Sequence, residues 1–422
     1  MELPPARRTL LGAAAMAGTG LLWGAAGTAA ADAGRAGRLP QGAVDAEVAR
    51  LERGLIALRR DLHRHPEAPG REERTAGVVA GELRAAGLAV TTGIGGHGVV
   101  GVLRGARPGR TVAYRADMDA VPAAGIVGGG TAPAHVCGHD VHTTVALGVA
   151  RTLARLRRRL SGTVVFLFQP AEEALAGARA MIDAGVLERT GVAEIHALHC
   201  GPFPVGRFAV TPGHGLPGQD HAEVTLTGPD APAAARRLAA EIGALATVTP
   251  PRTPADLERM VADVQTPDGP LARFVAVRAG ALDTKVSVSY RCWPQERYTG
   301  VREDIRRLAA FHPGAGVRFP GEPFPAMVCP ESDARALARR LRRTLGRDTV
   351  TELHAAFPFN GEDFALYLDR VPGTYTFLGV RAPGAPITTA YPHYPDFAPD
   401  ERAIAAGVRA MAGWIAERTH RP

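Results

Sequence analysis

Residues 163–173 read TVVFLFQPAEE, an apolar run that stops at a proline and two glutamates. Such a short run of β-branched and aromatic residues predicts a buried strand, which Pro170 breaks into a loop. Similar strand-like segments stand at residues 111–120 (TVAYRADMDA) and 193–202 (AEIHALHCGP), with helical segments between them. Strands that alternate with helices predict an α/β domain with a central, mainly parallel sheet flanked by helices. Functional loops are then expected at the strand ends.

The same alternation continues on both sides of this segment. Apolar periodicity predicts helices over residues 43–65, 72–87, 142–160, 178–187 and 331–345, and further strands over residues 99–105 and 374–380. These segments assign residues 40–215 and 322–420 to one discontinuous catalytic domain.

The pattern changes near residue 219, where the strand-like segments become alternating rather than continuously apolar. Residues 221–228, 273–280, 284–290 and 316–321 predict strands, and residues 231–246 and 298–311 predict helices. This β-α-β-β-α-β order is typical of a small ferredoxin-like α+β domain. The sequence therefore predicts an inserted domain over residues 219–320, with the Pro-rich segment 249–270 left unassigned.

Length and composition bear on the number of domains and on nucleic-acid binding. The chain has 422 residues, which suggests two or three domains, and a formal charge of +7. Lys285 is the only lysine, the arginines are scattered through helical stretches, and aromatic residues make up only 5%. Nucleic-acid binding usually needs basic residues clustered with aromatics on one face. We therefore expect no nucleic-acid partner.

The first 31 residues are typical of a twin-arginine signal peptide. Arg7 and Arg8 precede a short apolar run rich in Gly and Ala, and small residues end it at Ala29–Ala31. A membrane anchor is the alternative, but the run is short for a stable span. We expect cleavage near Asp32, export to the periplasm or beyond, and no stable membrane association afterwards. The four cysteines contain no CxxC pair, and their number leaves room for one disulfide.

Residues 135–144 read HVCGHDVHTT and bring thiol and imidazole groups together. Cys137 and His139 flank Gly138, whose backbone freedom lets both side chains point inward. Thiolate, imidazole and carboxylate are the ligands of borderline metals such as Zn²⁺. The alternative is a polar loop with a satisfied histidine.

Carboxylates follow two of the strands. Glu172 and Glu173 are adjacent, so in an extended segment they point opposite ways, and one can bind metal while the other acts as acid or base. A solvated pair opening a helix is the alternative. Asp117 and Asp119 are two apart on a strand and share a face, where two like charges need a cation or a shared proton.

Two more histidine segments complete the set. His196 and His199 stand at a strand end, and His393 lies in a Pro-rich loop near the C-terminus. Strand ends on one edge of an α/β sheet converge. Thiol, imidazole and carboxylate groups at several such junctions together predict a metal site.

Seven ordered motifs resemble one family. They are RRDLHRHPE (59–67), RADMDA (115–120), HVCGHDVHTT (135–144), FQPAEE (168–173), HALH (196–199), NGEDFA (360–365) and HYPDFAPD (393–400). This set resembles the amidohydrolase branch of the co-catalytic metallopeptidases, the group of aminoacylases, hippurate carboxypeptidases and auxin-conjugate hydrolases.

The resemblance implies two divalent metal ions (Zn, Mn, Co or Ni), a general base at Glu172, and an inserted lid domain, through which homodimers are common in the family. Asp117 or Asp119 would orient a ligand or tune the base. The implied metal ligands are Cys137, His139, Glu173, His199 and His393.

The lid departs from the family pattern. Residues 227–235 (TGPDAPAAA) lack the family histidine that steadies the oxyanion, often across a dimer, and residues 281–287 (ALDTKVS) replace an Asn-x-Ile-Pro segment. The implied reaction is hydrolysis of an N-acyl amino acid or related small amide by metal-activated water. The alternatives are a dipeptidase or ureido-amide hydrolase on the same site, or a non-catalytic protein that binds metal or small molecules.

Overall fold

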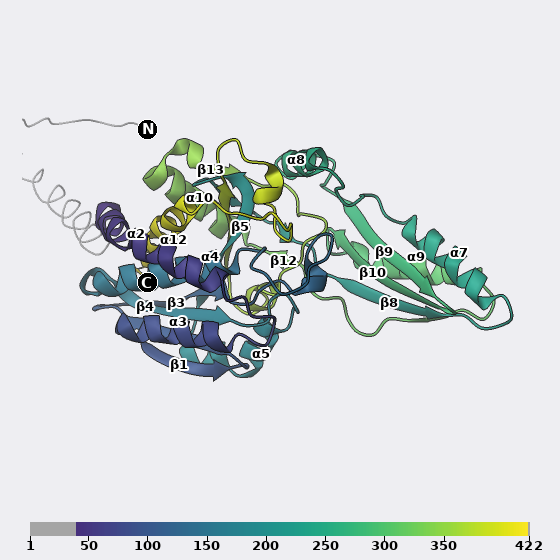
Figure 1. The fold of residues 1–422 in the computed structure, drawn as a ribbon, viewed down its shortest axis with the longest axis horizontal. Helices are drawn as coiled ribbons and strands as arrows, with labels where there is room; N and C mark the ends of the chain where they lie inside the picture. The colour runs from purple at the N-terminus through teal and green to yellow at the C-terminus, as the bar shows by residue number, and fades with distance from the viewer. Residues whose placement is uncertain (1–38, 421–422) are drawn as a thin grey trace, which may run out of the picture. The chain divides into compact units, whose positions relative to one another are not determined.

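The computed structural model describes residues 39–420, which belong to one compact unit. The predicted signal segment, residues 1–31, lies outside the described residues, so export remains a prediction. Within residues 39–420, no helix has both the length and the apolar character that crossing a bilayer requires. The predicted α/β class with a mainly parallel central sheet is confirmed (Figure 1).

The central sheet has eight strands. In spatial order they are β1 (Ala89–Ile94), β2 (Gly98–Arg104), β4 (Ser161–Gln169), β3 (Arg107–Asp117), β5 (Glu194–Pro204), β14 (Gly373–Arg381), β6 (Phe208–Val210) and β13 (Val350–Glu352). The pairs β3–β4, β3–β5, β5–β14 and β6–β13 are parallel. The strands β2 and β3 follow each other along the chain but do not pair, because β4 lies between them and pairs with both.

Strand β4 explains why the chain forms this sheet. Phe166 and Phe168 pack into the apolar cluster on one face, and Val165 and Leu167 pack into the cluster on the other face. All four side chains are fully buried, and each such burial stabilises the fold by about 1.5–3 kcal/mol. A strand that is covered on both faces has a continuous run of apolar residues in its sequence, which is the pattern of residues 163–168.

Helices cover both faces of the sheet. One cluster includes apolar residues of α2 (Gln41–His63), α3 (Glu73–Ala85), α4 (His139–Arg155), α10 (Glu331–Leu345) and α12 (Arg402–His420). The other includes α5 (Gly177–Asp183), α6 (Val186–Thr190), α8 (Pro254–Asp263) and α11 (Ala365–Leu368). The helices α2, α4 and α12 pack against one another (Figure 1).

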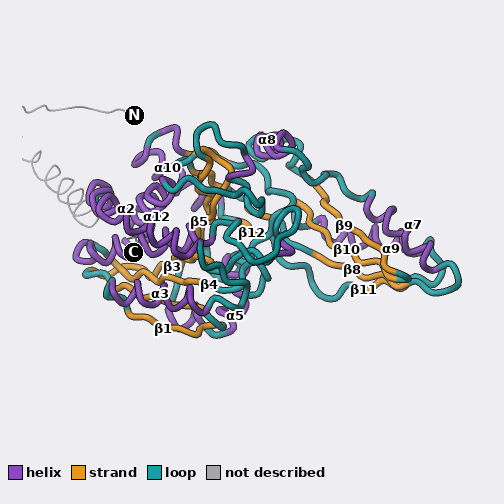
Figure 2. Tube along the Cα trace, in the orientation of Figure 1, coloured by secondary structure: helices purple, strands orange, loops and turns teal. Residues whose placement is uncertain are grey.

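A second sheet forms between residues 220 and 318. Its order is β11 (Gly316–Arg318), β8 (Asp220–Thr225), β10 (Lys285–Trp293) and β9 (Phe274–Leu282), all antiparallel. The helices α7 (Ala231–Gly243) and α9 (Arg297–Ala310) pack on these strands (Figure 2). Two short strands, β7 (Gly215–Leu216) and β12 (Met327–Val328), pair where the chain enters and leaves this segment. The division into domains and the role of this segment as a lid remain predictions.

The bounds of one predicted helix are wrong, and one unassigned segment forms a helix. Helix α4 begins at His139, not at His142, and ends at Arg155. The unassigned segment 249–270 contains helix α8, which a capping box starts: the Thr253 hydroxyl accepts from the Asp256 backbone N–H, and the Asp256 carboxylate accepts from the Thr253 N–H.

Candidate metal centre

The turn before α4 directs Cys137 and His139 to one place. Gly138 has φ 96°, in the left-handed region, and it precedes the first residue of the helix. A Cβ atom on Gly138 would lie 2.6 Å from Sγ of Cys200 on the neighbouring strand β5. Glycine is therefore required here both by the backbone conformation and by the close approach of β5.

Gly138→Ala is expected to destabilise the protein more than an ordinary left-handed glycine does. Gly96 has φ 100°, and a Cβ atom added to it would meet no other atom within 4 Å, so it is a matched control. Gly96→Ala should cost about 1–2 kcal/mol for the backbone alone. Gly138→Ala should cost about 1–3 kcal/mol more for the steric clash. Urea unfolding measures both, and equal costs would show that the approach of Cys200 is unimportant.

Three histidines form hydrogen bonds through Nδ1 and turn Nε2 toward the centre. His139 Nδ1 lies 3.3 Å from Oδ1 of Asp119, His199 Nδ1 lies 2.7 Å from the carbonyl oxygen of Cys200, and His393 Nδ1 lies 3.0 Å from that of Gly125. In each ring Nδ1 donates to an oxygen, which leaves the Nε2 lone pair free. This is how proteins orient metal-binding histidines.

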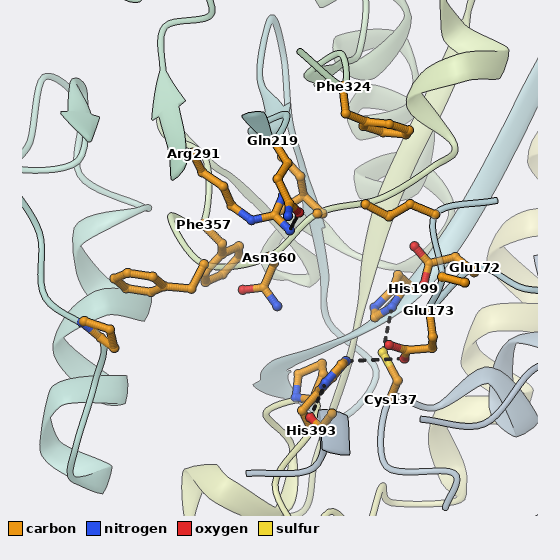
Figure 3. Close-up of a pocket in the computed structure, with 18 of the residues that line it drawn as sticks. Cys137, Glu172, Glu173, His199, Gln219, Arg291, Phe324, Phe357, Asn360 and His393 are labelled. Carbon is orange, nitrogen blue, oxygen red and sulfur yellow. Dashed lines mark hydrogen bonds and ion pairs between the residues drawn. The ribbon is translucent and has the colours of Figure 1, made fainter. Parts of the chain in front are cut away.

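The free Nε2 atoms meet sulfur and carboxylate oxygen (Figure 3). His199 Nε2 lies 3.4 Å from Sγ of Cys137, and His393 Nε2 lies 3.3 Å from Oε1 of Glu173. His139 Nε2 lies 3.8 Å from the same oxygen of Glu173. The groups Cys137–His139–His199 and Cys137–Glu173–His393 each gather within 4.8 Å and share the thiol.

This donor set fits divalent metal ions. The Nε2 atom of His139 is buried and has no hydrogen-bond partner, which is costly unless a cation takes the lone pair. Ligand atoms that hold a tetrahedral ion at about 2.0–2.3 Å lie roughly 3.3–3.8 Å from one another. The measured separations fall in this range, and two donor groups sharing one thiol suit two ions. The structure thus brings all five predicted ligands together.

The glutamate pair does not point in opposite directions, and that prediction is wrong. Residues 172–175 form a turn, with positive φ at Ala171 (52°) and Leu175 (50°), so the segment is not extended. Within the turn both carboxylates face His139 Nε2, with Glu172 Oε2 at 3.9 Å and Glu173 Oε1 at 3.8 Å.

Asp117 and Asp119 approach His139 from its two ring nitrogens. Oδ1 of Asp119 lies 3.3 Å from Nδ1, and Oδ2 of Asp117 lies 3.8 Å from Nε2. Asp119 also accepts from the backbone N–H of Glu173 at 2.9 Å, which holds the glutamate turn. Asp117 is paired instead with His142, at 2.7 Å from Nδ1. Asp119 therefore orients a predicted ligand directly.

The remaining histidines of the motifs lie outside the cluster. His142 Nε2 accepts from the backbone N–H of Cys200 at 2.7 Å, so both its ring nitrogens are occupied. His196 contacts Thr374 and Trp414 on the other side of β5. His135 stacks on His63 with 6.4 Å between ring centroids. All four cysteines are buried free thiols, so no disulfide forms among them.

Burial and crowded charge distinguish Glu172 from its neighbour. Burial raises the pKa of Glu172 well above its ordinary value, and the carboxylates of Glu362, Glu173 and Asp363 raise it further. Burial alone would also raise the pKa of Glu173, but His393 and His139 outweigh it and lower that pKa. Glu172 is therefore suited to hold a proton, and Glu173 to stay ionised.

An arginine that the sequence did not single out lies behind the centre. Arg115 is 2% exposed and donates to Asp117 at 2.6 Å, to Glu362 at 3.0 Å and to Asp363 at 3.1 Å. It also donates to Gln169 at 2.9 Å. The only sequence signal was a charged residue in the apolar strand TVAYRAD. Glu362 and Asp363, which the motif NGEDFA contributes, thus connect to the cluster through Arg115.

A pocket of about 940 Å³ opens onto the cluster and contains Cys137, Glu172, Glu173, His199 and His393 in its wall. Arg291 lines it from strand β10 of the second sheet and Gln219 from the residue before β8, and neither was predicted (Figure 3). None of the described residues 227–235, where the family histidine is replaced, lines this pocket. Aromatic side chains form much of the remaining wall: Phe324, Phe357, Phe359, Tyr375, Phe377, Tyr391 and Tyr394.

Known proteins are similar to this chain in sequence and in fold. Residues 113–417 match the model of peptidase family M20/M25/M40. The chain is 31% identical over 377 residues to the N-acetylcysteine deacetylase of Bacillus subtilis (strain 168), covering 85% of this chain and 95% of that protein. It is 30% identical over 350 residues to the IAA-amino acid hydrolase ILR1-like 2 of Arabidopsis thaliana, covering 78% and 77%.

A solved structure is similar as well. The crystal structure of a Bacillus subtilis protein, described as a dinuclear metal-binding peptidase from the M20 family, matches with a TM-score of 0.67 and 28% identity. The match covers 88% of this chain and 99% of that one. These similarities, together with the donor groups described above, support two divalent metal ions in this site.

Proposed function

The chain belongs to peptidase family M20/M25/M40 and is a hydrolase of that family, and we propose that it cleaves the amide bond of N-acyl amino acids. The single observation that carries this proposal is the geometry of the centre. Three histidines turn their free Nε2 atoms to a buried thiol and a carboxylate, and Glu172, with its raised pKa, lies beside them.

Cys137, His139, Glu173, His199 and His393 would hold the two ions. Divalent metal ions in such a site lower the pKa of water and polarise a carbonyl group. Glu172 accepts a proton from the attacking water while the oxygen of that water bonds to the amide carbon. Glu172 then gives this proton to the leaving nitrogen as the carbon–nitrogen bond breaks. The elements of water are thus added across the amide bond, which gives a carboxylic acid and a free amine.

Arg291 supports a substrate that carries a carboxylate. Among the described residues its guanidinium donates only to neutral oxygens, those of Pro217 at 3.4 Å, Gly218 at 3.3 Å and the Gln219 side chain at 2.6 Å. Within residues 39–420 no carboxylate lies in ion-pair contact with it. A partly buried cation without a counter-ion that lines a pocket favours an anionic ligand. The carboxylate of an N-acyl amino acid supplies that charge.

Metal content and hydrolysis, measured together, test the proposal. Purified protein loaded with Zn²⁺, Mn²⁺ or Co²⁺ should bind two ions per chain and cleave N-benzoylglycine or N-acetyl amino acids. Chelation should abolish cleavage, and metal should restore it. His199→Ala should lose metal and activity, whereas His196→Ala, on the same strand but directed at Trp414, should keep its metal. Cleavage that survives complete metal removal would contradict the proposal, and so would a failure to cleave any amide or dipeptide.

A further inference from the structure

We propose that Asn360 is a further substrate-contacting residue, which binds the substrate carboxylate together with Arg291. This inference rests on the proposed function and extends it to one half of the substrate. Both residues line the pocket, Arg291 from strand β10 and Asn360 from the loop before Glu362, and both are drawn there in Figure 3.

The loop and the arginine are in direct contact. A Cβ atom on Gly361 would lie 2.4 Å from Nη1 and 2.8 Å from Nη2 of Arg291. The guanidinium therefore lies against the bare backbone of Gly361, in space that any other residue would fill. Asn360 is the preceding residue, and consecutive Cα atoms are about 3.8 Å apart. The Asn360 side chain thus branches from the chain one residue before the backbone that contacts the guanidinium.

The amide group of Asn360 is held in a defined orientation. The Tyr391 hydroxyl donates to Asn360 Oδ1 at 2.9 Å. The carbonyl end of the amide is therefore occupied, and the NH₂ end makes no hydrogen bond to any of the residues 39–420. An amide pinned at its oxygen beside a pocket offers its NH₂ group as a donor. Tyr391 is a positioning residue for this donor.

The pocket has two chemically different ends. Glu172 and Glu173 line it at the metal centre, where the amide bond has to lie if Glu172 is to act on it. At the other end Arg291 supplies N–H donors and a positive charge, and Asn360 supplies its NH₂ group. A carboxylate placed there accepts from a charged and a neutral donor at once, which leaves the amide bond directed toward Glu172.

Asn360→Asp tests the inference because it replaces the NH₂ donor with a carboxylate of the same shape. The substrates are an N-benzoyl amino acid and the same compound with its carboxylate converted to a carboxamide. Asn360→Asp should lower kcat/KM for the acid by about 100-fold, and Asn360→Ala by about 10-fold. The carboxamide should change by less than about 3-fold in either variant, because it has no charge to repel. Tyr391→Phe, which only frees the amide, should show the same preference with a smaller loss.

Binding without turnover separates this inference from the proposed function. In Glu172→Gln protein, calorimetry should show the acid binding more weakly once Asn360→Asp is added, with the carboxamide unchanged. Equal losses for acid and carboxamide would overturn the role of Asn360, as would an unchanged affinity for the acid. Failure of wild-type protein to cleave either compound, with the binding pattern intact, would overturn the reaction and leave the carboxylate site standing.

Discussion

Replacing Glu172 with glutamine is expected to lower kcat by about 10²–10⁴-fold while both metal ions stay bound. Glutamine keeps the size of the side chain but cannot accept a proton from water. Burial and three nearby carboxylates keep the pKa of Glu172 raised, so the wild-type rate should fall as the pH drops and Glu172 becomes protonated. That acidic limb should be missing from the residual rate of the variant. Steady-state kinetics across pH, with elemental analysis of bound metal, measures both effects.

The neighbouring residue provides a matched control. Glu173→Gln makes the same chemical change one position along, at a carboxylate that lies 3.3 Å from His393 Nε2 rather than among Glu362 and Asp363. It should lose metal as well as activity. If Glu172→Gln also loses its metal, or keeps the wild-type rate, Glu172 is not the base.

Replacing Arg115 with glutamine is expected to lower the free energy of unfolding by about 3–5 kcal/mol. The change leaves Asp117, Glu362 and Asp363 buried without the guanidinium that now contacts all three. Although burial raises the pKa of Asp117, His139 and Arg115 outweigh it and hold that pKa well below its ordinary value. A carboxyl group with a lowered pKa stabilises the fold above the ordinary carboxyl range and loses that contribution as the pH falls. The deficit of the variant should therefore shrink in acid.

Arg50→Gln provides the comparison for that experiment. Arg50 contacts Glu47 at 2.9 Å, but its side chain is 53% exposed. Its loss should change the free energy of unfolding by less than about 1 kcal/mol. Urea unfolding of the metal-loaded proteins measures both variants. Equal effects would show that the buried network around Arg115 contributes no more than a surface ion pair.

Local pattern was enough to predict most elements of the fold. Continuous apolar runs identify strands that are covered on both faces, as β4 shows with Phe166 and Leu167 on opposite sides. The order of the strands could not be predicted, because β4 comes between β2 and β3 through pairings that no short segment specifies. Helix α8 was hidden in a Pro-rich segment, although Thr253 and Asp256 form its capping box.

The predicted ligands lie at strand ends or in loops beside them, and the topology of the sheet explains why they meet. The residues that were missed depend on contacts across the whole chain. Arg115 meets Glu362, 247 residues away in sequence, and Arg291 of strand β10 meets the backbone of Gly361 in a loop of the larger segment. The direction of Glu172 depended on a positive φ at Ala171, which an alanine in the sequence does not indicate.

The position of His393 sets the order in which the centre can be assembled. Cys137, His139, Glu173 and His199 all precede the second sheet along the chain, whereas His393 follows it. A nascent chain emerges from the ribosome N-terminal part first. It can therefore gather four of the five ligand residues early, but the group Cys137–Glu173–His393 stays open until His393 has been made. An ion bound there joins a segment that precedes the second sheet in sequence to one that follows it, so a fully loaded centre marks a chain in which both segments have folded together.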